Sequence, residues 1–284
     1  MIRPLIATIV LSLVPAVAIA QTTPTPAPSP APSAPPAPSP WYPALGNNDP
    51  CTSLSAIVTR PTVTNSVCTV RPNHVEIETG YFNTTSPGAG NTVTYPQTLI
   101  RVGTKIPALE LQVAPPQIVR SSVNGPATTG VSDVGAGLKY VFGYTPKFNY
   151  GGQVFFTAPT GTNGVSANGS TAIYALNAGY TLSPVFSVAT TLQSQSLTNG
   201  AQRWSSFVPS LVVSASLPNT TGVYAEITQY SEANGPGTPT RTQYIYGVYR
   251  GIGDRLQIDA SASVSPTVST GKYHGVGFGF SYYL

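Results

Sequence analysis

The last thirteen residues of the chain, 272–284, alternate between large apolar side chains and small ones. The large set is Val276, Phe278, Phe280, Tyr282 and Leu284, and the other set is Gly275, Gly277, Gly279, Ser281 and Tyr283. Because successive side chains of a β-strand point to opposite faces, the segment predicts a strand with one apolar face and one nearly bare face. A soluble sheet usually carries charge on the face away from its core. The glycine face therefore indicates a confined, filled interior.

The same alternation recurs from His74 onward and predicts twelve strands. They are 74–82, 92–103, 107–114, 134–144, 148–157, 171–181, 183–194, 204–217, 221–230, 241–250, 255–264 and 272–284. About ten residues per strand, tilted about 45°, cover the ~25 Å apolar band of an outer membrane. The sequence therefore predicts an all-β protein, a twelve-stranded antiparallel transmembrane outer-membrane β-barrel over residues 72–284.

Connections between the predicted strands alternate in length. The long ones are 83–91, 115–133, 158–170, 195–203, 231–240 and 265–271, and the short ones are 104–106, 145–147, 182, 218–220 and 251–254. This alternation is typical of outer-surface loops and periplasmic turns. An even number of strands then places both termini in the periplasm, with the barrel in a bacterial outer membrane. Pro96 and Pro209 predict bulges or strand ends, and strand 241–250 is apolar on both faces.

Composition supports the barrel and excludes two other classes. Charged residues make up only 8% of the chain, against about 25% in ordinary soluble domains. No apolar run beyond the amino terminus is long enough for a membrane-spanning helix, which excludes a helical membrane protein. The formal net charge of +4 is scattered along the chain, so a nucleic-acid partner is not expected.

Three segments precede the predicted barrel. Residues 1–20 have the positive start, apolar run and small-residue cleavage site of a signal peptide, so the protein is expected to be exported. Residues 21–43 are rich in proline and predict an extended periplasmic spacer, or a ligand for a periplasmic partner. Residues 44–71 are predicted to form a periplasmic segment closed by a disulfide between Cys51 and Cys68, the only cysteines.

The charged residues within the strands fall on the small or polar parity. They are Glu76, Glu78, Arg101, Glu110, Lys139, Glu226, Arg255 and Asp259. Because Arg or Lys at the lipid midplane costs about 2–4 kcal/mol, we expect these side chains to face the lumen. A two-residue turn at 105–106 would place Arg101 directly opposite Glu110. The set is either a structural network that fills a narrow barrel or a selectivity ring along a permeation path.

Two segments carry a resemblance to a known family. Residues 132–142, SDVGAGLKYVF, and residues 76–81, EIETGY, resemble strands of an outer-membrane barrel family described as transporters of the meta-pathway of phenol degradation. The resemblance covers about residues 50–284. Ser132 stands where the family more often has glycine, and the chain ends in Leu284 where an aromatic residue is usual. The resemblance implies passive permeation of small hydrophobic or aromatic solutes.

Two other functions are compatible with a barrel of this kind. One is a plugged structural barrel whose loops or proline-rich spacer bind partners. The other is a lipid-active enzyme resembling the twelve-stranded outer-membrane phospholipase, which uses His, Ser and Asn. The chain has only His74 and His274, and abundant serines make a His–Ser coincidence uninformative. We therefore expect no enzyme activity, no metal and no cofactor. The expected partners are outer-membrane lipid, a small solute, and the barrel-assembly machinery through the last strand.

Overall fold

The computed structural model describes residues 46–86, 90–122, 126–233, 235–268 and 271–284, which belong to one compact unit. The predicted signal peptide and proline-rich spacer lie outside these residues. No helix in the described ranges is long and apolar enough to cross a membrane.

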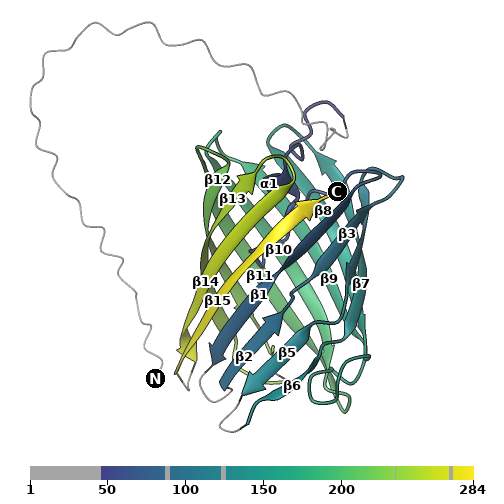
Figure 1. The fold of residues 1–284 in the computed structure, drawn as a ribbon, viewed down its shortest axis with the longest axis vertical. Helices are drawn as coiled ribbons and strands as arrows, with labels where there is room; N and C mark the ends of the chain where they lie inside the picture. The colour runs from purple at the N-terminus through teal and green to yellow at the C-terminus, as the bar shows by residue number, and fades with distance from the viewer. Residues whose placement is uncertain (1–45, 87–89, 123–125, 234, 269–270) are drawn as a thin grey trace, which may run out of the picture. The chain divides into compact units, whose positions relative to one another are not determined.

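A single antiparallel sheet forms the wall, and pairing of its first strand with its last closes it into a barrel (Figure 1). The described elements are α1 Leu54–Ile57, β1 Val75–Ser86, β2 Gly90–Tyr95, β3 Leu99–Gly103, β4 Leu109–Ala114, β5 Ile118–Ser122, β6 Thr128–Val131, β7 Val134–Tyr144, β8 Phe148–Ala158, β9 Thr171–Thr181, β10 Phe186–Thr198, β11 Arg203–Leu217, β12 Thr221–Tyr230, β13 Arg241–Ile252, β14 Leu256–Val268 and β15 Gly271–Tyr283. Three spans are split in two (β2 with β3, β4 with β5, β6 with β7), so the wall has twelve spans. The predicted fold is confirmed.

The two prolines predicted to disturb strands behave differently. The span containing Pro96 is interrupted between Tyr95 and Leu99, as predicted. Pro209, in contrast, lies inside an unbroken β11 whose register with β10 does not shift. The ladder between β11 and β12 ends at Ser210, next to Pro209, because the proline nitrogen carries no hydrogen to donate. A bulge at Pro209 was therefore a wrong expectation, because only one of its two ladders is affected.

The connections are less unequal than the sequence predicted. One end of the barrel, the turn end, carries residues 104–108, 145–147, 182–185, 218–220 and 253–255. At the opposite loop end, residues 159–170 and 231–240 make long connections. Much of the predicted loops 83–91, 115–133 and 265–271 instead extends the strands or forms β5 and β6. These Ser-, Thr- and Asn-rich stretches lack an apolar alternation, yet their backbone groups still pair across the ladder.

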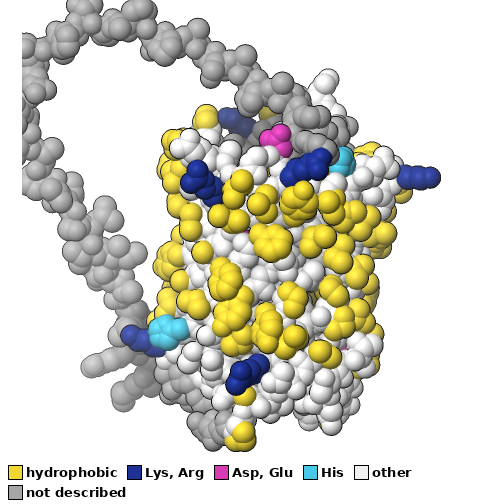
Figure 2. Space-filling model, viewed as in Figure 1, with side chains coloured by type: hydrophobic (Ala, Val, Ile, Leu, Met, Phe, Trp, Pro, Cys, Tyr) yellow, Lys and Arg dark blue, Asp and Glu magenta, His cyan; other side chains and the backbone are white. Residues whose placement is uncertain are grey.

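The predicted facing of the last strand is confirmed. Val276, Phe278 and Phe280 are exposed on the outside, whereas Gly275, Gly277 and the buried Ser281 face the interior. Strand β13, ambiguous from sequence, directs Tyr244, Tyr246 and Val248 outward and Ile245 inward. Figure 2 shows hydrophobic side chains across the middle of one face of the barrel, with Lys and Arg at its two ends.

The outward belt generates a prediction with a matched control on one face of β15. Phe278 is 60% exposed in the middle of the strand, and His274 is exposed on the same face near the loop end. We expect Phe278→Lys to destabilise the barrel by about 2–4 kcal/mol and His274→Lys by about 0–1 kcal/mol, because the cost of charge falls toward the interface. Urea-dependent folding into lipid vesicles measures both values. Equal values would contradict the assigned depth of the two positions.

Candidate functional site: a segment bound inside the barrel

Residues 49–71, here called the interior segment, lie within the barrel and contact its lumen-facing side chains. The sequence predicted a periplasmic location for this part of the chain, and the structure corrects that location. Val75 and Leu284 exchange backbone hydrogen bonds at the turn end, so the interior segment passes into the lumen immediately before β1. The first strand of the wall, β1, begins at Val75.

The interior segment is braced by covalent and ionic links. The predicted disulfide between Cys51 and Cys68 is present and spans a separation of 17 residues, a loop whose closure contributes about 3 kcal/mol. The Nη2 atom of Arg71 donates to Asp49 Oδ2 at 2.5 Å and to the Cys51 carbonyl oxygen at 2.6 Å. Ile57 and other buried apolar side chains pack around the disulfide. The segment is therefore a compact body rather than a loose strand.

Arg101 on β3 is the centre of a buried charge cluster in the wall. Its Nη1 atom lies 2.7 Å from Glu76 Oε2 and 2.8 Å from Glu78 Oε1. Its Nε atom lies 2.8 Å from Glu110 Oε1. The arginine and all three carboxylates are almost completely buried. Because an unpaired buried charge is costly, these four groups depend on one another.

The same cluster binds the main chain of the interior segment. Arg101 donates to the carbonyl oxygens of Ile57 at 2.6 Å and Cys68 at 2.9 Å. Glu78 accepts from the backbone N–H groups of Thr59 and Arg60 at 3.0 and 2.9 Å. Glu110 accepts from the N–H of Val70 at 2.8 Å. Arg101, Glu78 and Glu110, which the sequence predicted to face the lumen, thus bind the main chain of the interior segment.

A carboxylate outside the Arg101 cluster binds residues 63–64 of the interior segment. Glu226 on β12 accepts from the N–H groups of Val63 at 3.0 Å and Thr64 at 2.5 Å, and from the Thr64 hydroxyl at 2.7 Å. The N–H of the next residue, Asn65, donates to the Thr191 hydroxyl at 2.9 Å. Charge-assisted bonds of this kind are stronger than neutral ones and fix the depth to which the segment inserts.

Arg60 of the interior segment forms an ion pair with another part of the wall. Its guanidinium group pairs with Asp259 on β14 at 3.2 Å. A Cβ atom added at Gly80 or Gly279, which face each other in register, would collide with that guanidinium group. The two glycines therefore provide space for Arg60, which is one reason why the inner face of β15 is almost bare.

The remaining predicted residues lie in different environments. Lys139 on β7 is buried, pairs in register with Glu110, and its Nζ atom has no hydrogen-bond partner among the described residues. Arg255 is only half-buried, in the turn before β14. Arg101 stands opposite Gln112 rather than Glu110, because the connection 104–108 is longer than the predicted two-residue turn. The ion pair of Arg101 with Glu110 therefore joins diagonal positions on the neighbouring strands β3 and β4.

Sequence reasoning missed the partners that the interior segment itself supplies. Arg60, Arg71 and Asp49 form ion pairs inside the barrel, but none was singled out. A signal was present: in a chain with so few charges, these three lie close to the two cysteines. Tyr283 was also missed, and its hydroxyl accepts a hydrogen bond from the N–H of Arg71.

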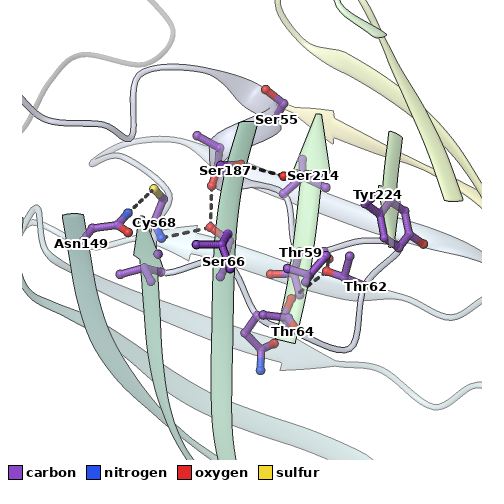
Figure 3. Close-up of a pocket in the computed structure, with 18 of the residues that line it drawn as sticks. Ser55, Thr59, Thr62, Thr64, Ser66, Cys68, Asn149, Ser187, Ser214 and Tyr224 are labelled. Carbon is purple, nitrogen blue, oxygen red and sulfur yellow. Dashed lines mark hydrogen bonds between the residues drawn. The ribbon is translucent and has the colours of Figure 1, made fainter. Parts of the chain in front are cut away.

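A cavity of about 210 Å³ separates the interior segment from one side of the wall (Figure 3). The segment lines it with hydroxyl groups such as those of Thr62, Thr64 and Ser66, and strands β8 to β13 line the other side. Ser187 and Ser214 on neighbouring strands share a 2.7 Å hydrogen bond at its wall. Most of the lining residues are uncharged, and they combine hydroxyl groups with apolar side chains such as Val188 and Val212, in contrast to the charged contacts that hold the segment elsewhere.

The two histidines lie apart from this cavity. His74 contacts the carbonyl oxygen of Leu284 through Nδ1 and packs against the Tyr283 ring, while His274 is exposed on the outer surface. Among the described residues, no group of three or more His, Cys, Asp and Glu side chains could hold a metal ion.

Comparisons with known proteins identify the fold. No protein-family model matches the sequence, and no curated protein matches it. An outer-membrane channel from Pseudomonas putida F1 superposes with a TM-score of 0.57 at 15% identity, covering 75% of this chain and 96% of that one. The NanC porin superposes with a TM-score of 0.51 at 9% identity, covering 73% and 98%. The chain has the fold of outer-membrane channels.

The binding of the interior segment generates a prediction. Glu226→Ala removes the acceptor for the Val63 and Thr64 N–H groups, each of which contributes about 1.5–3 kcal/mol when bonded to a charge. We expect hydrogen exchange of these two amides to quicken at least tenfold in the refolded protein. Gln229→Ala, at an outward position of the same strand, is the control and should leave exchange unchanged. Unchanged exchange in Glu226→Ala would contradict the contact.

Proposed function

We propose that the protein is an outer-membrane channel for small solutes, which pass through the cavity beside the seated interior segment. The cavity carries this proposal. Ion pairs and charge-assisted bonds hold the interior segment to β1, β3, β4, β12 and β14. Strands β10 and β11 contact it only through neutral hydrogen bonds, such as those of Thr191 and Ser210, and β9 to β11 line the cavity. A solute therefore meets the least resistance along those strands.

The lumen-facing charges take a structural role in this proposal. Arg101, Glu78 and Glu110 are occupied by the interior segment, so they set its position rather than form a selectivity ring. The path itself is lined by groups such as Ser187, Ser214 and Tyr224. Neutral hydroxyl groups and tyrosine rings suit small, weakly polar solutes, and hydrophobic or aromatic compounds are the class that the family resemblance implies.

Orientation and partners complete the proposal. The turn end faces the periplasm, which places both termini there. The outward apolar belt contacts outer-membrane lipid, and β15 presents the barrel to the assembly machinery. The proline-rich spacer connects the interior segment to the periplasm, where a partner can bind it. Short connections at the end where the interior segment passes into the lumen support this orientation.

A plugged structural barrel is the second candidate. The many contacts of the interior segment favour it, because they fill the side of the lumen around Arg101 completely. The two candidates differ in one measurable property: a plugged barrel conducts no ions, whereas a channel does.

Filling the cavity tests the proposal. Ser214→Trp places a large ring in the cavity, whereas Val213→Trp places the same ring on the exposed outer face of β11. We expect the single-channel conductance of Ser214→Trp to fall to roughly half or less, because a narrower path carries fewer ions. Val213→Trp should conduct like the unaltered protein.

The outcomes separate the two candidates. Equal conductance in both variants would place the path elsewhere and contradict the proposal. A silent bilayer with the unaltered, correctly folded protein would favour the plugged barrel.

A further inference from the structure

A second group of lumen-facing residues lies at the loop end, away from the interior segment. Arg241 begins β13, Tyr230 ends β12 in register with it, and Tyr273 stands near the start of β15. The Cζ atom of Arg241 is 4.8 Å from the ring centroid of Tyr230 and 4.4 Å from that of Tyr273. Cation–π contacts with both rings fix the guanidinium group in place.

Arg241 has no anionic partner within the described part of the chain. The other arginines inside the barrel, Arg60, Arg71 and Arg101, each pair with a carboxylate. The side chain of Arg241 forms no ion pair and no hydrogen bond with any described residue, and its Nε atom is closed off from solvent without a partner. Glu226, the nearest carboxylate along the inner face of β12, is already occupied by Val63 and Thr64.

The geometry specifies the kind of ligand. With tyrosine rings near the guanidinium group and Nε closed off, the edge formed by Nη1 and Nη2 is the route by which an anion can approach. That edge presents a planar fork of donors that matches the two oxygens of a carboxylate. Phosphate or sulfate would also carry charge, but an aromatic wall favours an anion with an apolar body. Phe82 extends this wall, because its ring packs over Gly277 on the same inner face as Tyr273.

We propose that Arg241, Tyr230 and Tyr273 form a binding site for the carboxylate of an organic monocarboxylate with an apolar or aromatic body. Arg241 binds the carboxylate, and the tyrosine rings and Phe82 contact the body. The proposal refines the solute class of the proposed channel and rests on that function only for the route by which the solute reaches the site.

Binding by the full chain, refolded in detergent at low salt, tests the site. Isothermal titration uses benzoate as the probe, benzyl alcohol as its uncharged counterpart and acetate as the carboxylate without a body. We expect benzoate to bind more tightly than either. Arg241→Gln should weaken benzoate binding about tenfold or more, because a bidentate charge-assisted contact is lost. Arg241→Lys should weaken it less, since the charge remains but the fork does not.

Arg203→Gln is the matched control. Arg203 also lies at the loop end but is exposed, and it bonds to Ser196 and to the Ser170 carbonyl. The Arg203→Gln substitution removes one positive charge at the loop end, as Arg241→Gln does, and it should leave benzoate affinity unchanged. Equal loss in Arg203→Gln and Arg241→Gln would indicate a general electrostatic effect and overturn the site. Equal affinity for benzoate and benzyl alcohol would also overturn it.

This test does not depend on conduction. Benzoate binding that requires Arg241, in a protein that conducts no ions, would support the site and contradict only the channel. Conduction through a protein that binds no benzoate would contradict only the site.

Discussion

The contact between Arg101 and three buried glutamates is the interaction on which the rest of the interior depends. A guanidinium group removed from water must be offset by carboxylates and by hydrogen bonds to its remaining donors. The wall supplies Glu76, Glu78 and Glu110, and the interior segment supplies the carbonyl oxygens of Ile57 and Cys68. Without the segment, the guanidinium N–H groups of Arg101 and the carboxylate oxygens of Glu78 and Glu110 would lose hydrogen-bond partners. The wall and the segment are therefore one cooperative structure.

The size of the barrel explains why a segment is needed at all. Eight strands enclose a space that their own side chains fill, whereas a wider barrel leaves a lumen. Here bulky inward residues such as Phe82 and Phe155 cover the glycines at the loop end, and the interior segment fills the turn end. Because the charged contacts of the segment avoid β9 to β11, the unfilled remainder borders those strands. The cavity is a consequence of asymmetric binding.

The sequence predicted the wall well and the interior poorly, for physical reasons. Lipid outside and a crowded lumen inside force a period of two, which is visible in 272–284 and places Arg101 and Glu226 inward. The interior segment has no such period, because its main-chain groups make most of its contacts with the wall and every residue has those groups. Strand extensions beyond the apolar band, such as β5, also escaped prediction, since Ser and Thr there look like loop residues. The pairing of Arg241 with Tyr273 joins residues from different strands and leaves no local signal.

The central claim is that solutes pass while the interior segment remains seated. A cross-link tests it directly: the hydroxyl oxygens of Thr64 and Ser210 are 2.8 Å apart, so Thr64→Cys with Ser210→Cys can tie the tip of the segment to β11. Single-channel conductance is then recorded before and after reduction of the added disulfide, with completeness of the cross-link checked by mass spectrometry. The account predicts equal conductance in the tied and untied states. Conductance that appears only after reduction would contradict it, because the segment would then have to leave its seat for the channel to open.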